Sequence, residues 1–117
     1  MNDLIRPTLY EAYHGIRPVK EPGSETPRMV ADVVGPVCES GDYLALGREM
    51  PEVAPGDLIA VMSAGAYGAV QAGTYNSRLL VPEVLVRGSE AAVVRPRQSY
   101  EDLIALDRMP DWLSPQG

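Results

Sequence analysis

Glycine and proline interrupt this chain so often that long regular elements are disfavoured. The 117 residues include eleven glycines and eleven prolines, together nearly a fifth of the chain. Proline lacks a backbone donor, and glycine weakens the interior of a helix or strand. The spacing of these residues therefore favours short strands joined by turns, and it predicts a mostly β fold.

Two stretches in the first half of the chain have the composition of strands. Residues 30–37 are rich in β-branched side chains, and Gly35-Pro36 stops the regular pattern near their end. Residues 43–46 form a shorter candidate. Both are expected to be short, because turn-forming residues lie between them.

The second half of the chain contains a further strand and a hairpin signal. Residues 58–62 are uniformly apolar, which predicts a strand buried on both faces. Residues 83–87 and 91–95 are separated by Gly88-Ser89-Glu90, and this order predicts a β-hairpin.

Helical signals lie near the two ends. Residues 6–12 can form a short helix that tolerates Pro7 in its first turn. Ser99 and Asp102 have the spacing of a capping box ahead of an apolar segment. We therefore expect a mostly β, barrel-like domain with a short helix near each end.

Charge and hydropathy exclude several classes of partner. The formal net charge is −6 and the isoelectric point is about 4.6, whereas nucleic acids and anionic membranes are bound by basic surfaces. No apolar run approaches the roughly 18 residues of a membrane-spanning helix, and residues 1–6 do not resemble a signal peptide. We expect no nucleic-acid or membrane partner and a cytoplasmic location.

The chain has few residues that bind transition metals. Cys38 is the single cysteine and His14 the single histidine, so they cannot together fill a metal coordination shell. We expect no metal site and a structural role for His14. A lone cysteine also excludes an internal disulfide and fits a reducing compartment.

Four clusters contain residues that could carry chemistry: residues 6–10, 35–42, 63–68 and 74–78. Each has a structural interpretation as well. Arg6 and Tyr10 would share one face of a helix as surface neighbours. Cys38 could be a small buried apolar residue, and the glycines of 63–68 could simply allow a tight turn, since their spacing is not that of a dinucleotide-binding loop.

The four clusters, taken in this order, resemble the carboxy-terminal part of the diaminopimelate decarboxylases, which use pyridoxal 5'-phosphate. The matching phrases are Arg6-Pro7-x-Leu9-Tyr10, Cys38-Glu39-Ser40-Gly41-Asp42, Ala64-Gly65-Ala66-Tyr67-Gly68 and Tyr75-Asn76-Ser77-Arg78. The resemblance extends over nearly the whole chain, from Met1 to Leu103.

The resemblance implies an architecture larger than this chain. Such enzymes join a cofactor-binding (β/α)8 barrel to a β-domain of the alanine racemase/ornithine decarboxylase type, and they work as homodimers. The barrel supplies the Schiff-base lysine and most phosphate contacts, but it needs about 200 residues or more. We therefore expect residues 1–117 to be a single C-terminal β-domain without the barrel, inactive alone, whose abrupt start at Met1 fits a missing preceding domain.

The resemblance assigns the proton donor of the reaction to Cys38. The cofactor accepts the electrons released when the Cα–carboxylate bond breaks, and Cα must then be protonated. An ordinary thiol, with a pKa near about 8.5, is mostly protonated at neutral pH and can serve as the acid. In the family this cysteine reaches the active site of the partner subunit.

The other matched residues would recognise the substrate, meso-2,6-diaminopimelate. Arg6 and Tyr10 match the positions that hold its distal carboxylate, and Glu39 matches the position that holds its distal ammonium. Tyr67 matches a tyrosine that contacts both cofactor and substrate. The function implied is conversion of meso-2,6-diaminopimelate to L-lysine and carbon dioxide, the last step of lysine biosynthesis.

Two alternatives remain beside this interpretation. The chain could belong to a related basic-amino-acid decarboxylase, although those substrates lack the distal carboxylate that Arg6 and Tyr10 would bind. It could also be a stand-alone binding or dimerisation module that has the fold without the chemistry. If it is part of a larger enzyme, we expect an exposed apolar surface and self-association through it.

Overall fold

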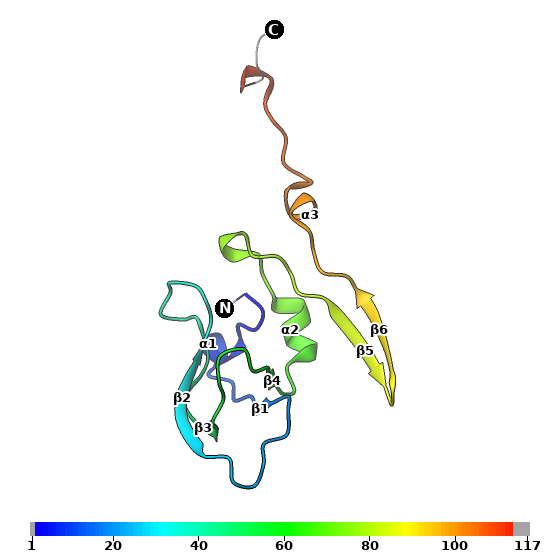
Figure 1. The fold of residues 1–117 in the computed structure, drawn as a ribbon. Helices are drawn as coiled ribbons and strands as arrows, with labels where there is room; N and C mark the ends of the chain where they lie inside the picture. The colour runs from blue at the N-terminus through cyan, green and yellow to red at the C-terminus, as the bar shows by residue number, and fades with distance from the viewer. Residues whose placement is uncertain (1, 114–117) are drawn as a thin grey trace.

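The computed structural model describes residues 2–113, which form three separate two-stranded antiparallel sheets (Figure 1). The pairs are β1 (Ile16–Pro18) with β4 (Ile59–Val61), β2 (Arg28–Val34) with β3 (Tyr43–Pro51), and β5 (Glu83–Arg87) with β6 (Glu90–Arg95). The helices are α1 (Arg6–Tyr10), α2 (Gly65–Gln71) and α3 (Tyr100–Ile104), with 3-10 turns η1 (Tyr75–Ser77) and η2 (Asp111–Leu113). The mostly β prediction is confirmed. The described residues form no closed barrel, and Met1 lies outside them.

The pairing of β2 with β3 contains a bulge that the sequence pattern did not reveal. β2 ends at Val34, directly before Gly35, as predicted. β3 continues five residues past the predicted end at Leu46, because Gly47 adopts a positive φ of 56° and acts as an irregularity within the strand. The register shifts between Ala31 and Val33 opposite this point, and the Gly47 N–H donates to Asp32 Oδ1 at 2.7 Å. Gly47 therefore bends the strand pair and does not end it.

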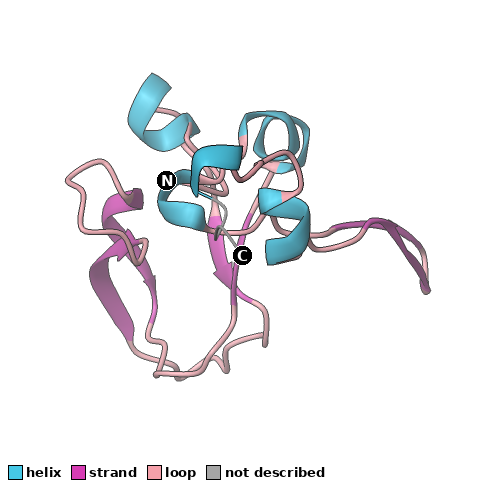
Figure 2. Ribbon diagram, turned by 90° about the horizontal axis from the view of Figure 1, so that it is seen from above, coloured by secondary structure: helices cyan, strands magenta, loops and turns pink. Residues whose placement is uncertain are grey.

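The hairpin of β5 and β6 is confirmed, with a tighter turn than expected. Arg87 pairs with Glu90, so the loop is the two residues Gly88-Ser89. Gly88 has a positive φ of 60°, which suits the first position of a type II′ turn. Seen from above, the hairpin projects away from the other strands (Figure 2).

β4 is shorter and less buried than its composition indicated. The strand covers residues 59–61, and all three are half-buried. Leu58 is 72% exposed and Met62 is 41% exposed, so the predicted burial on both faces is wrong for the described residues. Among residues 2–113, β4 pairs with β1 alone, so its other edge has no strand partner there.

Two of the helices confirm the sequence signals. α1 begins at Arg6 with Pro7 in its first turn, and it ends at Tyr10 because Glu11 has a left-handed backbone with a φ of 53°. At α3 the Asp102 N–H donates to Ser99 Oγ at 3.0 Å, and the Ser99 N–H donates to Asp102 Oδ2 at 2.9 Å. This capping box lowers the pKa of Asp102, the Ser99 N–H contributing most and the Ser99 hydroxyl next.

The helix α2 was not predicted. Its residues were interpreted as a tight turn because they include Gly65 and Gly68, yet they form seven residues of helix. A Cβ at Gly68 would lie 3.7 Å from Leu4 Cδ1, an ordinary packing distance. A Cβ at Gly65 would meet no atom within 4 Å, so neither glycine is required by close packing, and neither breaks the helix.

The buried core is small for a chain of this size. It centres on Ile16, Ala45 and Met50, with partly buried neighbours from β2, β3, β4 and the adjoining loop. The accessible surface is 9122 Å², whereas a compact monomer of this mass exposes about 6,200 Å². The radius of gyration is 18.6 Å, against about 13 Å for a compact domain of this length.

Much of the additional surface is apolar and lies on the second half of the chain. Figure 1 shows the segment after β6 extending away from the remaining elements. Large apolar side chains that are at least half exposed on this half include Val84, Leu85, Val86, Val93, Val94, Ile104, Leu106, Met109 and Trp112. The expected apolar exposure is therefore present, and self-association through it stays a prediction. Within residues 2–113, no helix has the length and hydropathy required to cross a bilayer.

Candidate functional site

Arg6, Tyr10 and Tyr67 come together where α1 meets α2. The Arg6 guanidinium carbon lies 4.7 Å from the centre of the Tyr67 ring and 5.9 Å from the centre of the Tyr10 ring. Aromatic faces attract a guanidinium without using its N–H groups. Arg6 is thus held between two rings while its donors remain available for an anion, as the sequence prediction for a carboxylate requires.

Cys38 and Glu39 lie at the tip of a loop that its own backbone closes. The Gly35 N–H donates to the Asp42 carbonyl at 2.7 Å, and the Asp42 N–H donates to the Glu39 carbonyl at 3.0 Å. Both Cys38 and Glu39 are exposed, so the interpretation of Cys38 as a buried apolar residue does not apply. An exposed thiol beside an exposed carboxylate can meet a ligand.

Asp42 holds the shape of this loop from inside. Its side chain is 5% exposed, and its Oδ2 accepts the Val37 N–H at 2.6 Å. The carboxylate lies directly over Gly35, in the space that a Cβ at Gly35 would occupy. Asp42 was quoted in the family phrase, but its role in closing the loop was not predicted. The contact between residues 35 and 42 depends on the folded loop.

We expect the substitution Gly35→Ala to destabilise the protein by about 1–3 kcal/mol, because the new methyl group overlaps the buried Asp42 carboxylate. The melting temperature of the purified protein measures this effect. Gly73→Ala is the matched control, since a Cβ there meets no atom within 4 Å and Gly73 has no positive φ. Equal melting temperatures for the two variants would contradict the role given to Gly35.

The loop is also attached to α1. The Thr8 hydroxyl donates to the Gly41 carbonyl at 2.5 Å, and the two residues are 33 positions apart. Arg6 and Tyr10 flank Thr8 on α1, while Cys38 and Glu39 share the loop with Gly41. The structure therefore brings the predicted residues onto two connected segments, one cationic and aromatic, the other carrying a thiol and a carboxylate.

The fourth cluster of the sequence is positioned by Asn2, which was not singled out from the sequence. Asn2 is 5% exposed, and its Nδ2 donates to the Gly73 carbonyl at 3.1 Å and the Tyr75 carbonyl at 2.7 Å. Asn76 and Ser77 follow with positive φ values of 56° each. Asn2 thus fixes a strained turn next to α2, which carries Tyr67.

His14 is buried and hydrogen-bonded to the backbone. It is 5% exposed, and its Nδ1 lies 3.0 Å from the Met62 carbonyl oxygen. This placement agrees with the structural role expected for it. Within residues 2–113, no group of three or more histidine, cysteine, aspartate or glutamate side chains is arranged to hold a metal ion.

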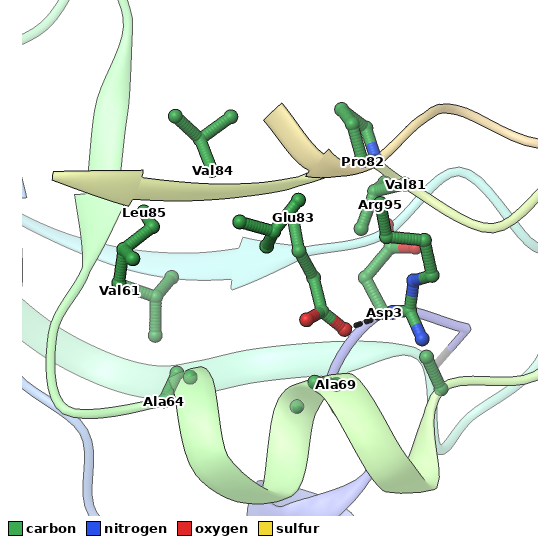
Figure 3. Close-up of a pocket in the computed structure, with 14 residues that line it drawn as sticks. Asp3, Val61, Ala64, Ala69, Val81, Pro82, Glu83, Val84, Leu85 and Arg95 are labelled. Carbon is green, nitrogen blue, oxygen red and sulfur yellow. Dashed lines mark ion pairs between the residues drawn. The ribbon is translucent and has the colours of Figure 1, made fainter. Parts of the chain in front are cut away.

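A cavity of about 490 Å³ lies between α2 and the β5–β6 hairpin (Figure 3). Its lining is mainly apolar, with the Glu83–Arg95 ion pair at one side, and small residues at and within α2, such as the N-cap Ala64 and Ala69, form a wall. None of Arg6, Tyr10, Cys38, Glu39 and Tyr67 lines it. These five side chains therefore lie outside the cavity, although Gly65 and Gly68, on either side of Tyr67 in α2, line it.

Comparison with known families agrees with this arrangement. Residues 1–65, more than half of the chain, match the model of the pyridoxal-dependent decarboxylase C-terminal sheet domain. The chain belongs to this family. Membership implies pyridoxal phosphate as the cofactor of the enzymes in which the domain occurs.

Individual relatives show which enzymes of this family the chain is similar to. The chain is 54% identical over 113 residues to a diaminopimelate decarboxylase of Zymomonas mobilis, with 97% of this chain and 26% of the relative covered. It is 50% identical over 112 residues to one of Archaeoglobus fulgidus, covering 96% of this chain and 26% of that protein. The chain spans about a quarter of the length of these curated relatives.

Solved structures show the same likeness. The diaminopimelate decarboxylase of M. jannaschii in complex with L-lysine superposes with a TM-score of 0.87 at 39% identity, covering 97% of this chain and 25% of that one. The protein AQ1208 of Aquifex aeolicus gives a TM-score of 0.85 at 48% identity, covering 92% of this chain and 27% of that one. The arrangement of short sheets seen here is thus shared with larger proteins.

Proposed function

We propose that this chain is the C-terminal β-domain of a diaminopimelate decarboxylase that converts meso-2,6-diaminopimelate to L-lysine and carbon dioxide. The main support for the proposal is that relatives with this name share about half of their aligned residues with this chain over nearly its whole length. The site supports it independently, since Arg6 lies between two tyrosine rings on a helix bonded to the loop of Cys38 and Glu39.

The residues present suit one edge of pyridoxal phosphate. The Tyr67 side chain is 55% exposed, and the space beside Gly65 is open, so a flat ligand can approach this end of α2. The single lysine, Lys20, is exposed in the loop between residues 6–10 and 35–42 and belongs to none of the four clusters. Most contacts to the cofactor are therefore assigned to the barrel domain, outside this chain.

The cofactor, when bound, supplies the electron acceptor for cleavage of the Cα–carboxylate bond. Cys38 then donates its thiol proton to Cα and recovers a proton from water. Its exposed position at the tip of the 35–42 loop fits a group that reaches across an interface. We assign the recipient site to the partner subunit of a homodimer.

Recognition of the distal end of the substrate falls to α1 of one subunit and to the 35–42 loop of the other, the same loop that carries Cys38. The planar guanidinium of Arg6 can pair with both oxygens of the distal carboxylate, with the Tyr10 hydroxyl as a further donor. The Glu39 carboxylate pairs with the distal ammonium. Each charge of the substrate's distal end thus meets one opposite charge, with Arg6 supplied by one subunit and Glu39 by the loop of the other.

The same proposal accounts for the open shape of the chain. The edges of the three two-stranded sheets and the exposed apolar residues of β5 and β6 would be covered in the full-length protein, where a barrel-like β-domain can close. We place this protein in the cytoplasm, because an exposed Cys38 thiol that must stay reduced suits a reducing compartment.

Substrate preference tests the proposed activity. We expect the full-length protein, loaded with pyridoxal phosphate, to decarboxylate meso-diaminopimelate with a kcat/KM at least about 100-fold above that for L-ornithine or L-arginine. The distal carboxylate that pairs with Arg6 is missing from both, and a charge-assisted pair contributes several kcal/mol to transition-state binding. Equal values would favour a basic-amino-acid decarboxylase.

Titration of the 117-residue chain with meso-diaminopimelate distinguishes the remaining alternative. We expect no measurable heat of binding, because the chain holds only the distal contacts and lacks the barrel. A dissociation constant in the micromolar range or below would identify a stand-alone binding module. A sedimentation profile without self-association would argue against the exposed apolar face as an interface.

A further inference from the structure

The helices α1 and α2 join the β1–β4 sheet at the same end. β1 follows α1 along the chain and β4 precedes α2, so the two helices diverge where the antiparallel pairing of these strands stops. The Met62 N–H donates to the Gly15 carbonyl at 2.7 Å, which extends the pairing one step beyond Ile16 and Val61. This junction therefore contributes to the position of α1 relative to α2.

His14 adds a side-chain hydrogen bond to the junction. Its Nδ1 lies 3.0 Å from the Met62 carbonyl oxygen. A carbonyl oxygen only accepts hydrogen bonds, so Nδ1 carries the proton and donates it. Nε2 is buried and has no hydrogen-bond partner among residues 2–113. The bond from Nδ1 therefore orients the ring, whereas a purely space-filling side chain at this buried position would be apolar.

The backbone of His14 is fixed as well, by a residue of β3. Arg48 Nη1 donates to the His14 carbonyl at 2.7 Å, and the Arg48 guanidinium carbon lies 4.1 Å from the centre of the Tyr13 ring. The segment that follows α1 is thus bound through its main chain to β3 and through the His14 side chain to the residue after β4.

These contacts hold the helix that carries the proposed carboxylate-binding residue Arg6. α1 has five residues and no side-chain N-cap, so it is too short to be stable alone. Before α1, Leu4 lies beside Gly68 of α2, and after α1, His14 is bonded to the segment that leads into α2. An apolar contact allows sliding, whereas a hydrogen bond fixes both a distance and a direction. The bond of His14 therefore defines how the end of α1 lies against the start of α2.

We propose that His14 is a positioning residue whose Nδ1–H bond keeps the Tyr67 ring against the Arg6 guanidinium and thereby strengthens binding of the substrate's distal carboxylate. The ring centre and the guanidinium carbon are 4.7 Å apart. The proposal rests on the function proposed above and extends it to a residue outside the matched site positions. His14 is 5% exposed and acts through the backbone, so it does not contact the substrate. Both helices belong to one chain, and the 35–42 loop takes no part in this geometry.

The test compares His14→Asn, whose amide N–H falls near the position of Nδ1, with His14→Gln, whose longer side chain places its amide near the position of Nε2. Both are made in the full-length protein loaded with pyridoxal phosphate, and titration calorimetry gives the dissociation constants of L-lysine and cadaverine. L-Lysine keeps the distal amino-acid group of the substrate, and cadaverine is the same diamine without the carboxylate. We expect His14→Gln to weaken L-lysine binding about tenfold, as loss of one hydrogen bond does, and cadaverine binding by less than about threefold. His14→Asn should retain most of the wild-type affinity for L-lysine.

Arg6→Met provides the reference pattern, since it should also weaken L-lysine binding more than cadaverine binding. Adding His14→Gln to it should weaken L-lysine binding little further, because the two changes affect one interaction. Amide hydrogen exchange within residues 62–68 reports the junction itself and does not depend on a ligand. Exchange should be faster in His14→Gln than in His14→Asn.

The outcomes separate this proposal from the proposed function. Equal weakening of the two ligands in His14→Gln, or no weakening of either, would overturn the positioning role while leaving the decarboxylase function in place. Equal exchange in the two variants would overturn it as well, and so would failure of both to fold, because His14 would then serve the fold and not the site. A wild-type protein that binds pyridoxal phosphate and does not decarboxylate meso-diaminopimelate would overturn the proposed function. A preference of that protein for L-lysine over cadaverine that His14→Gln abolishes would still support the positioning role.

Discussion

Replacing Cys38 with alanine in the full-length protein is expected to lower kcat for meso-diaminopimelate by about 10²–10⁴-fold, the usual contribution of a positioned general acid. The thiol is exposed at the loop tip, so its removal should leave the fold intact. Steady-state kinetics measure the loss, and the absorbance of bound pyridoxal phosphate shows whether the cofactor site is retained. Turnover that stays at the wild-type level would remove Cys38 from the mechanism.

Replacing Arg6 with methionine is expected to lower kcat/KM for meso-diaminopimelate by about 100-fold or more, because the distal carboxylate loses its cation. Arg6→Lys should lie between this variant and the wild type. It keeps the charge, but it loses the planar pair of donors and the fit between the rings of Tyr10 and Tyr67.

The matched control for Arg6 is Arg97→Met, which removes an exposed arginine from outside the site. It should leave kcat/KM within about twofold of wild type, as surface substitutions usually do. A loss in Arg97→Met as large as that in Arg6→Met would show that the effect comes from net charge. A wild-type value in Arg6→Met would contradict the assignment of the distal carboxylate.

Local sequence signals predicted those elements that depend on neighbouring residues. The capping box at Ser99 and the hairpin around Gly88 were both found where expected, because each is defined by residues a few positions apart. The predictions at Gly47 and at the glycines of α2 were wrong, because they too rested on neighbouring residues alone. Glycine weakens regular structure on average, but a strand pair accommodates Gly47 as a bulge, and α2 continues through Gly65 and Gly68.

The site could be predicted in part. Matching family phrases pointed to Arg6 and Tyr67, and the structure brings them within 4.7 Å. The residues that hold the site in place were not evident, because Thr8 and Asn2 act through backbone groups 33 and more than 70 positions away. Such contacts leave no periodicity or spacing in the sequence and can be found only in the folded chain.

Burial was the property least accessible from the sequence. Composition indicated that residues 58–62 form a strand with both faces covered, yet Leu58 is 72% exposed and Met62 is 41% exposed. Apolar strands of this kind are typical of a domain that packs against further chain, which composition cannot distinguish from a self-contained core. The surface of 9122 Å² supports the proposal that these residues are covered in a larger protein.

The most direct test of the central claim is the stoichiometry of the reaction of the full-length protein with meso-diaminopimelate and pyridoxal phosphate. We expect one equivalent of carbon dioxide and one of L-lysine for each substrate consumed, because Arg6 and Glu39 hold the distal end while only the other end loses its carboxylate. No release of carbon dioxide from the cofactor-loaded protein, or release of two equivalents, would contradict the account.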